Sequence, residues 1–227
     1  MDEAKATRMF ESAKAYCEKK YPHQVQWAKS ITPETFKNLD SKQFLSEYCW
    51  VVYTSGFRVS TIEAIFPKLE AAFKQLNLEA LATMESIKPV LAVFNNERKA
   101  SLLLAGSKRI AREGFTNFKR RLQSAGIEML EELPGIGPIT KIHLAKNIGL
   151  ADEAKPDVWL VRAAKACSST VEELVAFLSE KYRMSRHTVD VIIWRYGADK
   201  GLGLSKWVKR KRVRSGPEGS ECNARLE

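Results

Sequence analysis

The chain has 227 residues, 44% of them hydrophobic, with 37 Lys and Arg against 27 Asp and Glu and a formal net charge of +10. That apolar content suffices for one domain of ordinary size or two small lobes. The charged N-terminus lacks the apolar core of a signal peptide, and no apolar run is long enough to span a bilayer, so we expect a cytoplasmic protein. The basic balance favours a polyanionic partner, nucleic acid first, with plain solubility as the alternative.

The cysteines argue against a zinc knuckle. Cys17, Cys49, Cys167 and Cys222 are scattered along the chain, and no pair has the spacing of metal ligands. We expect all four to be reduced, as in a cytosolic protein.

The N-terminal segment is predicted to be helical and to pack on the body of the protein. Residues 1–30 carry apolar side chains at helical spacing, and Trp27 is placed to dock this arm. Asp40-Ser41 then has the cap chemistry of a helix start. The helix that follows, from Phe44 to Tyr53, is rich in aromatic residues and apolar on all sides, which predicts burial.

A turn at residues 54–58 separates this helix from the next, which we expect over 59–73. In the turn Phe57 and Arg58 stand side by side, and an aromatic beside an arginine can stack on a base or enter a gap in a duplex. Trp50 and Tyr53, just before the turn, either line a substrate pocket or pack in the core.

Short helices are expected over 76–84 and 87–94, and a longer one over 98–113. The longer helix has a basic side, made of Lys99, Lys108, Arg109 and Arg112. These residues are most simply a solvated face, and contact with phosphates is the weaker option.

The segment Leu133-Pro134-Gly135-Ile136-Gly137-Pro138-Ile139-Thr140-Lys141 predicts a tight hairpin between two helices. Helical spacing precedes it from Gly126 to Glu132, and its second proline suits the first turn of a helix that Gly149 ends. Two glycines flank one aliphatic residue and permit a turn with unusual φ. Such a turn exposes backbone N–H groups at a helix N-terminus, where an anion such as phosphate is favoured.

A second segment, Lys155-Pro156-Asp157-Val158-Trp159-Leu160-Val161-Arg162, follows one helix and one loop later. Asp157 stands directly before a helical run, where an Asp is commonly the N-cap. A last core helix is expected over 188–196, with Gly197 as its stop. The basic tail, residues 208–227, is expected to be disordered without a partner and to serve either DNA attraction or solubility.

The hairpin and the Asp157 segment together resemble the helix-hairpin-helix (HhH-GPD) family of base-excision DNA glycosylases. The resemblance implies an all-α, two-lobed helical fold whose first lobe, 41–150, contains the helix-hairpin-helix motif at about 126–149. The second lobe, 151–207, carries the Asp157 loop, and the arm 1–40 packs against it. The resemblance also implies a double-stranded DNA partner, and we expect a monomer.

The resemblance assigns Asp157 as the catalytic carboxylate, which stabilises positive charge on the sugar and orients the attacking water. Family members that also cut the strand use a hairpin lysine as an amine nucleophile. Ile139 occupies that position here, so a monofunctional glycosylase is implied. Lys155 stays open as an alternative amine nucleophile.

The remaining roles follow from the same resemblance. DNA-binding positions are Arg58, Gly135, Ile136, Gly137, Thr140 and Lys141. Substrate-pocket positions are Trp50, Tyr53, Ser55, Phe57 and Lys155. The family hairpin commonly holds a monovalent cation on backbone carbonyls, and we expect no other cofactor, because the close-set cysteines of an iron–sulfur cluster are absent. The family's common Gln-Gln-Thr type of turn is missing, so the resemblance does not set the target base.

Two other functions stay open at this stage. Some phage proteins that resemble these glycosylases replace an activated 5-substituent of a pyrimidine in DNA with an amine or amino acid and leave the base attached. The atypical turn at 54–58, the aromatic helix before it and Ile139 favour that reaction. The hairpin alone is also a common backbone-gripping device, which would make the chain a non-catalytic DNA-binding module.

Overall fold

The computed structural model describes residues 1–203, and every regular element in this range is a helix. The α-helices are α1 (Glu3–Lys20), α2 (Pro22–Ser30), α3 (Pro33–Asn38), α4 (Ser41–Thr54), α5 (Val59–Ala72), α6 (Leu78–Ala82), α7 (Lys88–Val93), α8 (Glu97–Glu113), α9 (Phe115–Ala125), α10 (Pro138–Asn147), α11 (Val158–Ala166), α12 (Val171–Tyr182) and α13 (Arg186–Lys200). Three short 3-10 helices complete the list: η1 (Lys74–Leu76), η2 (Ile127–Glu132) and η3 (Gly201–Gly203). The predicted all-α class is confirmed for this range, and the predicted disordered tail, 208–227, lies outside it.

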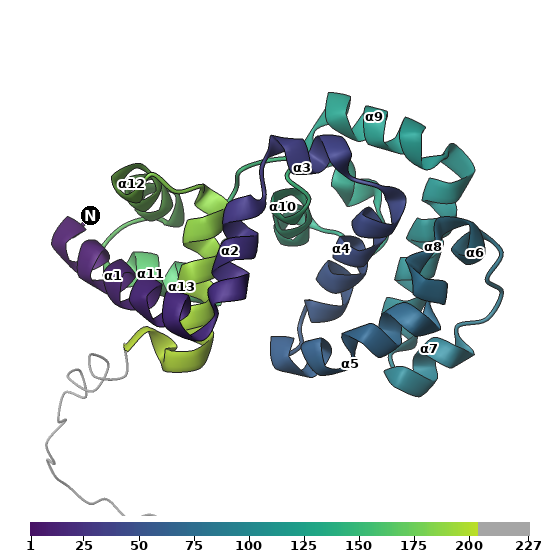
Figure 1. Ribbon diagram of the computed structural model, residues 1–227, viewed down its shortest axis with the longest axis horizontal. Coiled ribbons are helices and arrows are strands. Elements are labelled where there is room, and N and C mark those ends of the chain that lie inside the picture. Colours follow the sequence, from purple (N-terminus) through teal and green to yellow (C-terminus); the bar gives the residue numbers. More distant parts are fainter. Residues whose placement is uncertain (204–227) are drawn as a thin grey trace, which may run out of the picture.

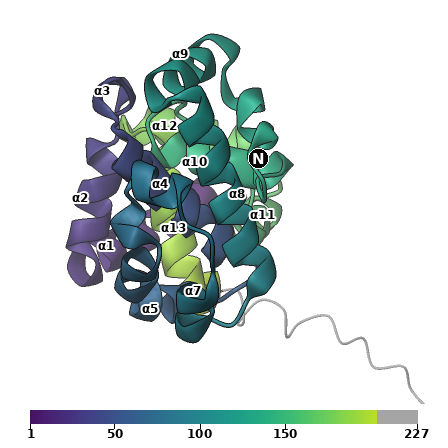
Figure 2. The same ribbon diagram turned by 90° about the vertical axis from the view of Figure 1, so that its right-hand side faces the viewer.

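Two hydrophobic clusters organise the molecule (Figure 1). The first is built on α4, whose Phe44, Tyr48 and Tyr53 are fully buried, and it extends through α5 to α10. The second joins the N-terminal helix α1 to α11, α12 and α13, with Phe10 and Ile192 fully buried. Figure 2 shows α1, α2 and α3 along one side of the molecule, so the chain passes from the second cluster into the first along this edge. No helix within residues 1–203 is both long and apolar enough to cross a membrane.

The helix starts follow the cap chemistry of the sequence. At the start of α4, the Asp40 carboxylate accepts the Gln43 N–H at 2.7 Å, and the Gln43 side-chain oxygen accepts the Asp40 N–H at 3.0 Å. Thr170 and Glu173 repeat this reciprocal pattern at α12. Because each pair satisfies two otherwise unpaired backbone donors, it fixes where the helix begins.

Two predictions about the helices are wrong, one about the type of a helix and one about where a helix ends. The segment before the hairpin, predicted with α-helical spacing, forms the 3-10 helix η2. Gly197 does not end the last helix, because α13 continues to Lys200. A Cβ at Gly197 would lie 2.8 Å from the ring of Trp159, so this glycine serves the close packing of α11 on α13.

Tyr48 connects the buried helix α4 to the hairpin. Its hydroxyl donates to the carbonyl oxygen of Pro134 and lies 3.3 Å from that of Leu102. Gly106 on α8 leaves room for the ring, since a Cβ there would lie 2.3 Å from the hydroxyl. The core therefore holds the hairpin by a side-chain hydrogen bond as well as by apolar contact.

We expect Tyr48→Phe to lower the free energy of unfolding by about 1–1.5 kcal/mol, because the half-buried Pro134 carbonyl loses its donor. Urea unfolding followed by circular dichroism measures this change. Gly106→Ala, which in an open helix would stabilise by about 0.5–1 kcal/mol, should here destabilise by about 1–3 kcal/mol. A stabilised Gly106→Ala variant would contradict the close contact with Tyr48.

Candidate functional site

The hairpin turn is held by two buried aliphatic residues. Leu133 and Ile136 belong to the first cluster, and the Ile136 N–H donates to the Leu133 carbonyl at 3.0 Å. Gly135 between them has φ +85 and is exposed, and its N–H finds no acceptor within residues 1–203. The positive φ explains the glycine, and the free N–H fits the predicted backbone contact at this position. The side chain of Ile136 is buried in the core, and contact of this position with DNA stays a prediction.

At the start of α10, a side chain of the helix itself accepts a backbone N–H group. The Gly137 N–H donates to the Thr140 hydroxyl at 2.7 Å, so these two predicted DNA contacts pair with each other. Lys141 forms ion pairs with Glu128 and Glu131 of η2, and these carboxylates raise its pKa. In this structure the Lys141 ammonium is held by these two acids, and its contact with a phosphate stays a prediction.

The turn at 54–58 projects an aromatic side chain. Phe57 is 41% exposed, and its ring rests edge-on against Phe94 with the centroids 5.1 Å apart. Arg58 beside it is exposed at the start of α5. The sequence prediction of an accessible aromatic beside an arginine fits this arrangement.

Lys99 fixes this turn, although its sequence pattern predicted a solvated face. Its ammonium donates to the carbonyl oxygens of Val52 and of Ser55, the latter at 2.8 Å, at the C-terminal end of α4. Cations suit this end of a helix, where carbonyls lack partners. Burial lowers the pKa of Lys99, and the nearby Arg98 adds to the effect.

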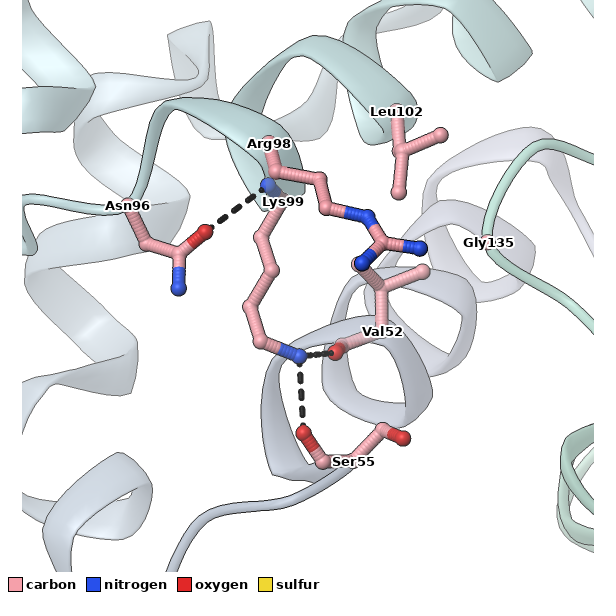
Figure 3. A pocket seen from close by; sticks show the side chains of 7 residues that line it. All are labelled: Val52, Ser55, Asn96, Arg98, Lys99, Leu102 and Gly135. Atoms are coloured by element: carbon pink, nitrogen blue, oxygen red, sulfur yellow. Dashed lines mark hydrogen bonds between the residues drawn. The ribbon is translucent and has the colours of Figure 1, made fainter.

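A hollow of about 300 Å³ lies between the end of α4, the start of α8 and the hairpin (Figure 3). Its polar lining comes from Ser55, Asn96, Arg98, Lys99 and Gly135. Ser55 and Gly135 were predicted site residues, and the fold brings them together. Asn96 and Arg98 were not predicted, although an Asn directly before a helical run is a common N-cap and signals a polar group here.

Two predicted pocket residues belong to the core. Tyr53 is fully buried, and its ring packs edge-on against Phe73 and Phe94. Trp50 is half-buried against Phe66, with ring centroids 5.2 Å apart. The sequence left open whether Tyr53 and Trp50 line a substrate pocket or pack in the core. In this structure both pack against the core.

Asp157 caps α11 and keeps part of its carboxylate available. One oxygen, Oδ1, accepts the N–H groups of Trp159 at 2.8 Å and Leu160 at 3.0 Å. The side chain is half-buried, and Oδ2 accepts no hydrogen bond from the described residues. One carboxylate thus combines the cap that the sequence predicted with an oxygen free to act on a ligand.

Polar and charged groups from two helices, α10 and α13, contact this loop. The buried Asp190 of α13 uses one oxygen to accept the Lys155 N–H at 2.8 Å and to pair with the buried Lys146 ammonium of α10 at 3.3 Å. The Lys155 ammonium in turn lies 3.5 Å from His143 Nδ1. The Asp157 loop is therefore clamped between the helix that follows the hairpin and the last helix.

Burial has the largest effect on the pKa values of Asp157, Lys155 and His143. It raises the pKa of Asp157, an effect that Asp190 increases and that the two N–H groups and Lys155 oppose. Burial lowers the pKa of Lys155, and it lowers the pKa of His143 with help from the positive charge of Lys155. His143 is consequently neutral at physiological pH and can accept from the Lys155 ammonium.

His187 forms the buried end of the same contact between the lobes. Its Nδ1 lies 2.9 Å from the Lys146 carbonyl oxygen and donates to it, while Nε2 is buried without a partner within residues 1–203. A proton on Nε2 would create a buried charge near the Lys146 ammonium. Burial and Lys146 accordingly lower the pKa of His187 to about 3.

Within residues 1–203, no three His, Cys, Asp or Glu side chains gather as ligands of a metal ion would. The monovalent cation on hairpin carbonyls stays a prediction. No family model, curated protein or solved structure matches the chain.

The folded protein keeps the His187 imidazole neutral. As the pH falls, this imidazole is therefore protonated in the unfolded chain before it is protonated in the folded protein. Stability from this group is complete above about pH 6.5 and declines toward pH 3. We expect His187→Asn, which keeps an amide donor for the Lys146 carbonyl, to reduce the loss of unfolding free energy between pH 7 and about 4.5 by roughly 2–3 kcal/mol. Denaturant unfolding at each pH measures it.

The matched control is His23→Asn, because His23 is exposed on α2. This variant should keep the wild-type dependence of stability on pH. Equal losses in wild type and His187→Asn would contradict a neutral, buried His187.

Proposed function

We propose that the protein is a monofunctional DNA glycosylase with a two-lobed HhH-GPD-like fold. The observation that carries this proposal is the half-buried Asp157 carboxylate at the start of α11, with one oxygen fixed by two backbone N–H groups and the other without a donor among residues 1–203. Its loop is joined through Asp190 and Lys146 to α10, the helix that follows the hairpin. In this proposal the hairpin binds the DNA backbone, and the helix that follows it holds the loop of the catalytic Asp157.

Breaking the bond between a base and deoxyribose requires stabilisation of positive charge on the sugar. The electron pair of the bond leaves with the base, which takes up a proton, and water adds to the sugar carbon while losing a proton. The Asp157 oxygen that is free of backbone contacts would face the developing charge and orient the water. Its fixed partner oxygen keeps the carboxylate from turning away.

The nucleotide must leave the duplex before this chemistry, because stacking hides the bond. Phe57, exposed beside Arg58 and braced on Phe94, is suited to fill the gap that the nucleotide leaves. The free N–H of Gly135 would hold a backbone phosphate. Double-stranded DNA is the proposed partner, the enzyme acts as a monomer, and no organic cofactor takes part.

Water serves as the nucleophile in this proposal. Ile139, 46% exposed at the hairpin, has no amine to attack the sugar. Lys155 is the competing nucleophile, favoured because burial lowers its pKa, although its amine already contacts His143. Trapping of a Schiff base with borohydride separates the two mechanisms.

The proposal is tested with a panel of duplexes that carry uracil, alkylated purines, mismatched or oxidised bases. A parallel duplex carries 5-(pyrophosphoryloxymethyl)uracil and is supplied with an amino acid. Alkali-sensitive sites support the glycosylase. A gain in mass on an intact base would instead show the transferase reaction, and binding without either change would show a non-catalytic module.

We expect Asp157→Asn to reduce turnover of the target base about 10²- to 10³-fold, because the charge that stabilises the sugar is lost. Asn is as good an N-cap as Asp, so the unfolding free energy should change by less than about 0.5 kcal/mol. Asp157→Ala removes the cap as well and should cost about 1 kcal/mol of stability. Wild-type turnover by Asp157→Asn would disprove the catalytic assignment.

We expect no covalent complex when the protein is treated with borohydride in the presence of a duplex containing an abasic site, because no lysine forms a Schiff base in the proposed reaction. Denaturing gel electrophoresis detects such a complex. A trapped complex that disappears in Lys155→Gln would assign Lys155 as an amine nucleophile and replace the monofunctional mechanism.

A further inference from the structure

The hollow shown in Figure 3 presents hydrogen-bond donors from three separate segments to one space. The Gly135 N–H, the Ser55 hydroxyl and the Asn96 amide nitrogen have no acceptor among the described residues. The exposed Arg98 has no ion-pair partner there either, and its guanidinium extends across the hollow toward Gly135. A ligand with several acceptor oxygens would satisfy donors that the protein itself leaves unpaired.

The charge of the hollow selects a negative ligand. Among residues 1–203 no Asp or Glu lines it, and both Arg98 and Lys99 do. Val52 and Leu102 supply an apolar floor. The volume of about 300 Å³ is at the lower end of the range for small-ligand pockets, which suits a phosphate with part of the attached sugar.

We infer that this hollow binds a backbone phosphate of the DNA strand, with Arg98 as its principal ligand. The inference rests on the DNA-binding part of the proposed function and names a contact that the hairpin alone does not provide. Arginine matches phosphate geometry through paired N–H donors, and Gly135 and Ser55 would complete the shell.

The hollow lies between the hairpin and the turn that carries Phe57, so a phosphate bound in it would be close to both. The hairpin borders it at Gly135, and the turn that carries Phe57 borders it at Ser55. Lys99 fixes both the wall and the turn, because its ammonium holds the Val52 and Ser55 carbonyls and lies 5.2 Å from the Phe57 ring centroid. A phosphate held here sets the register of the strand relative to Phe57.

The test compares Arg98→Ala with Arg120→Ala. Arg120 is exposed on α9, at the other end of the first lobe from the hollow, and its loss changes the net charge equally (Figure 1). Binding of an undamaged fluorescent duplex is followed by anisotropy over a range of salt concentrations. Arg98→Ala should weaken binding about tenfold and reduce the slope of log affinity against log salt by about 0.9. Arg120→Ala should stay within about twofold of wild type.

A second measurement uses inorganic phosphate alone. In a heteronuclear NMR titration, the amide signals of Gly135 and Ser55 should shift saturably in wild type and much less in Arg98→Ala. Absence of these shifts in wild type, or equal duplex affinities of the two variants, would overturn the inference.

Failure of this inference is distinguishable from failure of the proposed function. If Arg98→Ala behaves as expected and the duplex panel yields neither abasic sites nor altered bases, the phosphate site stands and the catalytic proposal falls. If the panel yields abasic sites and Arg98→Ala matches Arg120→Ala, the glycosylase stands and the phosphate site falls.

Discussion

The arrangement of the candidate site depends on the buried ion pair between Lys146 and Asp190. It joins a helix of the first hydrophobic cluster to a helix of the second, and both side chains are almost fully buried. Such a pair adds little net stability, because desolvation offsets the attraction, but loss of either partner would leave an unpaired buried charge. The same Asp190 oxygen accepts the Lys155 N–H, so the contact that aligns the lobes also places the loop of Asp157.

The hairpin is supported from the opposite side by the core. Tyr48 reaches from α4 to the Pro134 carbonyl, and Asn147 at the end of α10 donates to Glu47 of α4 at 2.8 Å. The two ends of the hairpin–α10 unit are thus fixed to one buried helix. A corner held in this way presents the Gly135 N–H in a constant direction, which backbone recognition requires.

The sequence predicts those features that depend on local chemistry. The caps at Asp40 and Asp157 and the accessible Phe57 are read from neighbouring residues alone. The sequence does not predict pairings made by the fold: η2 brings two acids against Lys141, and Trp159 packs onto Gly197. The Arg98 hollow was missed for the same reason, because its walls come from segments about forty residues apart in the chain.

The pairing of α1 with α13 has a consequence for synthesis of the protein. The first cluster uses a nearly continuous stretch of chain, from Phe36 to Ile148, and can form while the ribosome is still translating. The second cannot, because Tyr16 bonds Asp199, 183 positions later, and Phe10 packs with residues of α12 and α13. The N-terminal helix must therefore wait until α13 has emerged, which makes formation of the second cluster the late, high-contact-order step of folding.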